Sequence, residues 1–205
     1  MLEQRIQQHF IDSADLKYQA AQSLSHPIAA AVQAVLACVT SGGKVLACGN
    51  GPSAAHAQQF AAFCVAGFER ERPELAALAL SCDSALLNPV ASSSSGGAAS
   101  DVVQQFARQV RALGQAGDVL LALSVSGNDA NLLAAAEAAH ERDMTVVVLT
   151  GRTGGKLSAL LRETDVLISV PHDRAARVRE VHALVLHCLS DGVDAQLLGE
   201  QEIPL

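Results

Sequence analysis

Apolar and polar positions follow two different rhythms along this chain. From residue 3 to residue 24, apolar residues recur at helical spacing among Gln, Asp and Lys, which predicts an amphipathic helix. A second helix is expected from Pro27 to about Thr40, where a Ser-Gly-Gly sequence ends it. Beyond this point, short and continuously apolar runs predict strands at 44–48, 75–80, 118–123, 145–149 and 166–170.

Such strands alternate with helical patterns, which is typical of an α/β fold whose parallel sheet is covered on both faces. A long helix from about Arg174 to Leu197 closes the pattern. We expect one domain over residues 1–205, with an N-terminal helical pair at 1–41 and an α/β core at 42–205. The Ser- and Gly-rich segment at 91–100 predicts a mobile loop before a helix.

The composition indicates which residues form the core and which class of partner is excluded. Half of the 205 residues are hydrophobic but only 3% are aromatic, so the core should consist mainly of Ala, Val and Leu. The formal net charge of −7 argues against a surface that neutralises a phosphate backbone. We therefore expect no direct contact with nucleic acid.

The cysteines and the first ten residues of the chain indicate the cellular compartment of the protein. The cysteines are odd in number and have no C-x-x-C spacing, which favours free thiols in a reducing environment. They are Cys38, Cys48, Cys64, Cys82 and Cys188. The first ten residues lack the apolar core of a signal peptide, and no run reaches the length of a membrane span. We expect a cytoplasmic protein without membrane contact.

Two loops follow predicted strands and carry the most informative residues. They are Gly49-Asn50-Gly51-Pro52-Ser53 and Ser124-Val125-Ser126-Gly127-Asn128. Ligands of an open parallel sheet bind beyond the carboxyl ends of its strands, where glycines allow close approach and helix N-termini attract anions. Neither loop is a Walker or dinucleotide motif, and each alone could be an ordinary strand-to-helix turn.

Two such loops in one chain favour a phosphate site. The predicted phosphosugar-binding residues are Gly49, Asn50, Gly51, Ser53, Ser124, Val125, Ser126, Asn128 and Asp129. A free phosphate or sulfate anion would suit the same donors.

The motifs CGNGPS, ALSVSGN, VVVLTGRTGGKL and VPHDRAARVREVHALVLHCL resemble successive motifs of the phosphoheptose isomerase group of sugar-isomerase (SIS) proteins, over nearly the whole chain. The resemblance implies an SIS-type three-layer fold with a five-stranded parallel sheet, N-terminal helices that pack between subunits, and a homotetramer. It also implies phosphate held at Ser53, Ser124 and Ser126. Within the group, FERERP, QVRALGQAGDVLLALS and RDMTVVVLTG look closer to the DnaA initiator-associating proteins, DiaA.

The catalytic positions of the resembled isomerases are changed in this chain. Those enzymes carry a His and a Glu one turn apart after the first loop, and a Gln and a second His on the last helix; the four can bind zinc. The corresponding residues here are Gln59, Phe63, Arg179 and His187. Phe63 cannot take a proton and Arg179 would repel a cation, so only His187 is retained. We expect no metal and no cofactor, with zinc needed only if the protein is an isomerase.

The phosphate loops are altered too. The resemblance implies a hydroxyl residue where Val125 and Asp129 stand, and an Asn-Asp pair where Ala98-Ala99 stand. A carboxylate at position 129 would compete with phosphate for the same donors, unless it only marks the start of a helix.

Because the catalytic positions and the phosphate loops are altered, our leading hypothesis is a protein without enzymatic activity. In it the protein is a DiaA-type tetramer that binds the replication initiator DnaA and regulates initiation. The first alternative is a phosphoheptose isomerase that converts sedoheptulose 7-phosphate to D-glycero-D-manno-heptose 7-phosphate, and the second is a phosphosugar-binding sensor. Leu197 and Leu198, apolar in a polar stretch, are candidates for partner binding or for packing on a neighbouring subunit.

Overall fold

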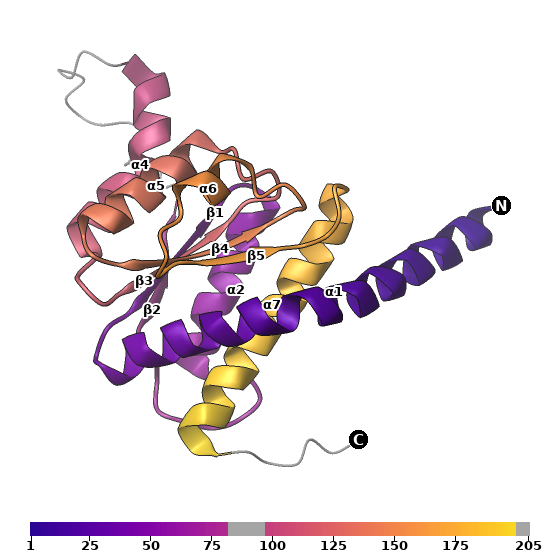
Figure 1. Cartoon of the computed structure of the whole chain (residues 1–205), viewed down its shortest axis with the longest axis horizontal. Coiled ribbons are helices and arrows are strands. Elements are labelled where there is room, and N and C mark those ends of the chain that lie inside the picture. Colours follow the sequence, from indigo (N-terminus) through magenta and orange to yellow (C-terminus); the bar gives the residue numbers. More distant parts are fainter. Residues whose placement is uncertain (82–96, 200–205) are drawn as a thin grey trace.

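The predicted apolar runs form one sheet in the computed structural model, which describes residues 1–81 and 97–199 (Figure 1). Its strands are β1 (Val45–Gly49), β2 (Ala77–Ala79), β3 (Val119–Leu123), β4 (Thr145–Thr150) and β5 (Val166–Ser169). Its helices are α1 (Leu2–Thr40), α2 (Pro52–Ala66), α4 (Gly97–Leu113), α5 (Ala130–Glu141), α6 (Gly155–Leu160) and α7 (Ala175–Leu198).

The sheet has the strand order β2-β1-β3-β4-β5, and every neighbouring pair is parallel. At its centre, Leu46 of β1 pairs with Leu78 of β2 and with Leu120 of β3. All residues of β1 and β3 are buried, which explains why their sequences are continuously apolar. The predicted five-stranded parallel sheet is confirmed.

Successive residues of the central strands face two separate apolar cores. Val45 and Ala47 belong to the core that includes buried residues of α1, α2 and α7. Leu46 and Cys48 belong to the core that includes buried residues of α4 and α5. Figure 1 shows the corresponding layers, with α4, α5 and α6 on one side of the sheet and α1, α2 and α7 on the other.

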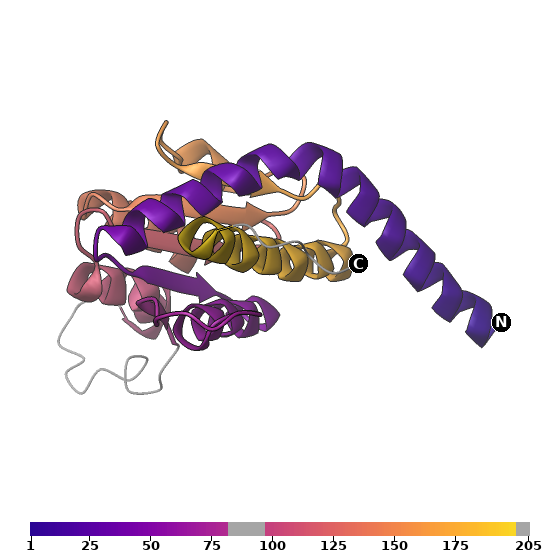
Figure 2. The ribbon, with the colours of Figure 1, turned by 90° about the horizontal axis from the view of Figure 1, so that it is seen from below.

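The N-terminal segment is a single helix, so the prediction of a helical pair at 1–41 is wrong. Pro27 lies inside α1, where its missing N–H leaves the carbonyl of Ser23 without a helical donor. Ser23 is exposed, so water can solvate that carbonyl. Packing of the following turns on α7 keeps the chain helical on both sides of the proline. Figure 2 shows the first part of α1 projecting away from the sheet and its helices.

Buried residues of α1 begin at Leu16 and continue to Cys38, in the part that contacts α7. By length and composition alone α1 could cross a membrane, but a helix that covers a core passes the same test. Its buried residues belong to the apolar core that α1 shares with α7.

The Ser- and Gly-rich segment is only partly a loop. Residues 97–100 belong to the first turn of α4, because Ala98 and Ala99 favour helix. The rest of the predicted loop, residues 91–96, lies outside the described residues. The Gly-rich turn at 151–155 leads into the short helix α6, which the sequence pattern did not predict.

The cysteines that the structure describes form no disulfide, as expected. Cys38, Cys48 and Cys64 are buried, whereas Cys188 is exposed on α7. Cys82 lies outside the described residues.

Candidate functional site

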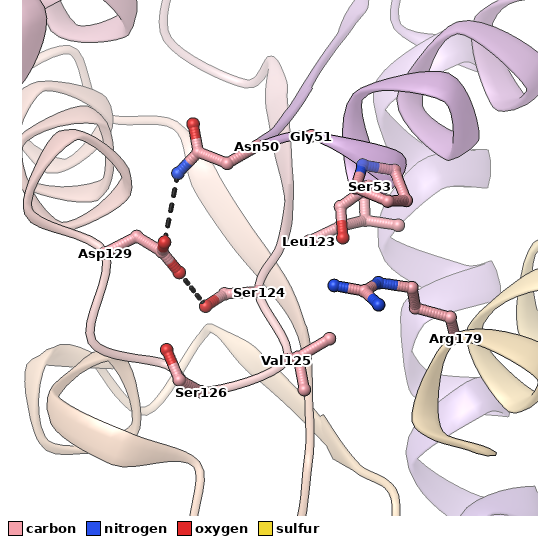
Figure 3. Close-up of a pocket in the computed structure, with 10 residues that line it drawn as sticks. Asn50, Gly51, Ser53, Leu123, Ser124, Val125, Ser126, Asp129 and Arg179 are labelled. Atoms are coloured by element: carbon pink, nitrogen blue, oxygen red, sulfur yellow. Dashed lines mark hydrogen bonds between the residues drawn. The ribbon is translucent and has the colours of Figure 1, made fainter. Parts of the chain in front are cut away.

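The carboxyl ends of β1 and β3 open into a cavity of about 320 Å³ (Figure 3). It is lined by Asn50, Gly51, Pro52, Ser53, Leu123, Ser124, Val125, Ser126, Asp129 and Arg179. The predicted phosphosugar-binding residues are all among them except Gly49 and Asn128. The two loops therefore meet at one edge of the sheet, as expected for neighbouring parallel strands.

Gly49 and Asn128, the two predicted residues that do not line the cavity, have structural roles. A Cβ atom on Gly49 would stand 2.7 Å from the carbonyl oxygen of Ser53, so only glycine lets α2 fold back this closely. The side chain of Asn128 donates to the carbonyl of Ser126 at 3.0 Å and accepts the N–H of Lys156 at 3.1 Å. Its amide thus joins two loops and does not face the cavity.

The first loop offers fewer free amides than its sequence suggests. The N–H of Ser53 donates to the carbonyl of Asn50, and that of Ala54 donates to Gly51, both at 3.0 Å. Pro52, the first residue of α2, has no N–H. The hydroxyl of Ser53 and other groups must therefore contribute more to anion binding than this helix start does.

Asp129 collects donors from both loops. Its carboxylate accepts the hydroxyl hydrogen of Ser124 and an N–H of the Asn50 side chain, the latter at 3.1 Å (Figure 3). It makes no capping hydrogen bond to α5, so it is not a helix-capping acid. Asn50 also exchanges two hydrogen bonds of 2.9 Å with the side chain of Asn131. The carboxylate thus occupies donors that the sequence assigned to phosphate.

Glycines bring the second loop against the turn before α6. A Cβ atom on Gly127 would stand 2.0 Å from the carbonyl oxygen of Gly154, and one on Gly155 would stand 2.3 Å from that of Ser126. The carbonyl of Gly127 accepts the N–H of Leu157 at 2.9 Å. The turn formed by the TGRTGG motif therefore packs against the second pocket loop and fixes its position.

The positions that hold zinc in the resembled isomerases do not fit a metal here. The ring of Phe63 packs edge-on against the ring of His187 at 5.6 Å between centroids, and Phe68 packs against both. Gln59 is half-buried on α2, and Arg179 is a cation. Across residues 1–81 and 97–199, no group of three His, Cys, Asp or Glu side chains could hold a metal ion. The expectation that no cofactor is needed stays a prediction.

The side chains of Arg179 and His56 were not among the predicted phosphosugar-binding residues. The guanidinium of Arg179 reaches the cavity from α7 and faces the ends of the two strands (Figure 3). His56 lies one helical turn after Ser53, and its Nδ1 is buried without a hydrogen-bond partner. Burial, and then the charge of Arg179, lower the pKa of His56, so its imidazole is neutral at neutral pH. The spacing of three between Ser53 and His56 was the available signal.

Behind these groups lies a fully buried histidine. The Nε2 of His182 is 3.1 Å from the carbonyl oxygen of Thr150. Burial is the main cause that lowers the pKa of His182 to about 4, with the charges of His56 and Arg179 adding to it. His182 is therefore neutral and structural at neutral pH.

Leu197 and Leu198 lie at the end of α7, where they are 37% and 41% exposed. Their role in partner binding or subunit packing stays a prediction, as do the homotetramer and the cytoplasmic location.

Curated relatives match the chain along its whole length. A protein of Methylibium petroleiphilum named "Phosphoheptose isomerase" is 62% identical over 203 residues, covering 99% of this chain and 98% of the relative. A protein of the same name from Azoarcus is 52% identical, covering 97% of this chain and 98% of the relative.

Solved structures agree with the sequence relatives. The phosphoheptose isomerase of Neisseria gonorrhoeae superposes with a TM-score of 0.85 at 45% identity, covering 95% of this chain and all of that one. The phosphoheptose isomerase of Francisella tularensis gives a TM-score of 0.86 at 40% identity, with 95% and 98% covered.

These comparisons overturn the leading hypothesis from the sequence. Relatives that match the whole chain, and the two structures above, carry the name of an enzyme, and none of these names refers to replication initiation. The DiaA-like, non-catalytic assignment is therefore wrong as the main interpretation. It gave three substituted catalytic positions, the altered phosphate loops and three short segments more weight than the similarity of the complete sequence.

The family follows from the whole chain. A family model described as the SIS domain matches residues 8–151, which contain both pocket loops. The relatives extend the match to α7, which carries Arg179 and His187. This chain belongs to the phosphoheptose isomerase group of SIS-domain proteins.

Proposed function

We propose that this protein binds a phosphosugar in the cavity between the β1 and β3 loops and interconverts its ketose and aldose forms. The proposed substrate is sedoheptulose 7-phosphate and the proposed product a heptose 7-phosphate. The observation that carries the proposal is 62% identity, over 99% of the chain, to a protein named phosphoheptose isomerase. The placement of the two Ser- and Gly-containing loops around one cavity supports a phosphorylated ligand.

Such a reaction needs a group that moves a proton between adjacent carbons. Phe63 cannot do this, and His187 packs against two phenylalanine rings. His56 is the better candidate base, because its imidazole is neutral, its Nδ1 has no partner and it lies one turn from Ser53. The charge of Arg179 helps to keep the imidazole of His56 unprotonated, which suits a base.

The test is turnover of sedoheptulose 7-phosphate in deuterated water, followed by NMR. We expect formation of the aldose with deuterium at the carbon that gains the proton. His56→Ala should lower kcat by about 10²–10⁴-fold. His26→Ala, at an exposed position of α1, is the matched control and should keep wild-type turnover. Turnover that persists unchanged in His56→Ala would assign the base to another residue.

A second candidate function is phosphosugar binding without turnover. The ring cluster of Phe63, Phe68 and His187 favours it, because this cluster fills positions where the resembled isomerases carry proton-transfer and metal-binding groups. The same experiment separates the two functions. Saturable binding of sedoheptulose 7-phosphate with neither aldose nor deuterium incorporation would support the binding protein and exclude the isomerase.

A further inference from the structure

One arginine of the last helix, Arg179, reaches the cavity with its guanidinium (Figure 3). The Nε of Arg179 is buried, and within residues 1–81 and 97–199 it has no hydrogen-bond acceptor. Arg177 on the same helix also has a buried Nε without a partner, but its Nη1 donates to the carbonyl of His9 and to the carboxylate of Glu180. The guanidinium of Arg179 lies at the cavity instead, where a ligand could supply acceptors.

The charges and donors that line the cavity suit an anionic ligand at Arg179. Among the described residues that line the cavity, Arg179 is the only cationic side chain. The one acid in the lining, Asp129, already accepts hydrogen bonds from Ser124 and Asn50, and it forms no ion pair with Arg179. A guanidinium presents five N–H donors in a planar fork that matches the oxygens of a phosphoryl group.

The two pocket loops have few free hydrogen-bond donors for an anion, and a cation across the cavity would compensate for this lack. The first amides of α2 donate within their own turn, and the hydroxyl of Ser124 donates to Asp129. The loops therefore supply weaker attraction for an anion than two helix N-termini with free donors would. A fixed positive charge that faces them restores it, without a metal ion.

We propose that Arg179 is the anion-binding residue of this pocket and pairs with the phosphoryl oxygens of the ligand, so that phosphate binding requires Arg179 and no metal. The inference rests on the proposed function, because it takes the ligand to be a phosphosugar. It goes further by assigning the phosphoryl contact to a residue on α7, beyond the two loops.

The test is isothermal titration of the full chain with inorganic phosphate, after treatment with EDTA. Arg179→Gln should weaken phosphate binding by at least about tenfold, as expected for the loss of charge-assisted hydrogen bonds. Arg179→Lys keeps the charge but loses the fork, so its affinity should lie between those of Arg179→Gln and wild type. Arg174→Gln, which removes an exposed charge from the same end of α7, is the matched control and should bind like wild type.

Thermal unfolding with and without phosphate shows whether each variant still folds. A folded Arg179→Gln protein should lose the phosphate-dependent rise in Tm that wild type shows. Equal affinity of Arg179→Gln and wild type would overturn the proposal, and so would equal weakening by Arg174→Gln, absence of phosphate binding by wild type, or a requirement for zinc. If wild type binds phosphate through Arg179 but does not turn over the heptose phosphate, the proposed isomerase fails and this inference stands.

Discussion

Ser124 donates its hydroxyl hydrogen to the carboxylate of Asp129, the residue directly before α5. The same hydroxyl oxygen accepts the N–H of Gly127 at 2.8 Å, so the side chain is engaged as both donor and acceptor. A phosphate that approaches Ser124 must displace the carboxylate or bind beside it.

Removal of that carboxylate should therefore improve anion binding. In Asp129→Ser, the hydroxyl of Ser124 becomes free and a negative charge leaves the start of α5. Charges at helix termini contribute about 0.3–1 kcal/mol, which corresponds to about two- to fivefold tighter binding of phosphate or phosphosugar. Isothermal titration measures the change.

Asp15→Ser is the control for this substitution, because it removes an exposed acid from α1. It should leave the affinity unchanged. If Asp129→Ser binds phosphate no better than wild type, the competition between this carboxylate and the ligand is not significant.

Gly127 should tolerate no side chain. Its φ of 68° favours glycine, and a Cβ atom would stand 2.0 Å from the carbonyl oxygen of Gly154. Gly127→Ala should thus lower the free energy of unfolding and weaken phosphate binding together. Gly117→Ala isolates the backbone cost, since Gly117 has a φ of 86° and no atom within 4 Å of a built Cβ.

Denaturant unfolding compares the two glycine variants. The left-handed conformation alone costs about 1–2 kcal/mol, and forced overpacking adds about 1–3 kcal/mol at Gly127 only. Equal destabilisation by both variants would mean that the two loops can separate at little cost.

The strands β1 and β3 were predictable because they are buried along their whole length and therefore continuously apolar. The predicted run at 44–48 is shifted by one residue from β1, and the run at 118–123 begins one residue before β3. The helix across Pro27 was not predictable, because packing of α1 on α7 overrides a local signal. Local patterns contain no information on such contacts between distant segments.

The pocket was predictable to the extent that it depends on glycine and serine at strand ends. The bond between Ser124 and Asp129 and the direction of Arg179 depend on where side chains from separate elements meet, which spacing cannot give. Arg179 was assessed only as a poor metal ligand. Its position in the cavity makes it a candidate anion ligand.

A buried ion pair holds the last helix to the end of α2. The side chains of Arg72 and Asp194 are each 2% exposed and bonded to one another, and Arg72 also donates to the carbonyls of Phe63 and Cys64 at 2.9 and 2.8 Å. Arg72→Met leaves a buried carboxylate unpaired, which should cost about 3–5 kcal/mol of unfolding free energy.

Urea unfolding should show that Arg72→Met combined with Asp194→Leu is less destabilised than Arg72→Met alone, because no charge is left buried. The exposed pair of Arg111 and Glu141 is the control, and Arg111→Met should have little effect on stability. Additive effects of the two buried substitutions would contradict a direct interaction between them.

The first part of α1 carries apolar side chains that the described part of the chain leaves exposed. Phe10 is 75% exposed and Ile11 is 52% exposed. We expect Phe10→Ser with Ile11→Ser to dissociate the predicted tetramer in sedimentation equilibrium, because water would replace apolar contacts between subunits. Val102→Ser with Leu113→Ser, both exposed on α4, should leave assembly intact. A monomeric wild type would remove this role for α1.

Acid should destabilise the fold through His182. Its pKa is lowered from 6.5 to about 4 in the folded protein, mainly by burial, so the unfolded chain binds a proton that the folded chain excludes between these values. The contribution is fully present above pH 6.5 and is lost as the pH falls toward 4, by about 3 kcal/mol in total. Unfolding free energies measured across this window should therefore fall with pH.

His182→Gln removes the titrating group and should flatten this part of the stability curve, even though loss of the bond to Thr150 lowers stability at every pH. His26→Gln, at an exposed position of α1, should leave the curve as in wild type. The slope is the informative quantity, because a purely structural effect shifts the whole curve without changing its shape. If His182→Gln keeps the wild-type slope between pH 4 and 6.5, the acid sensitivity arises from other groups.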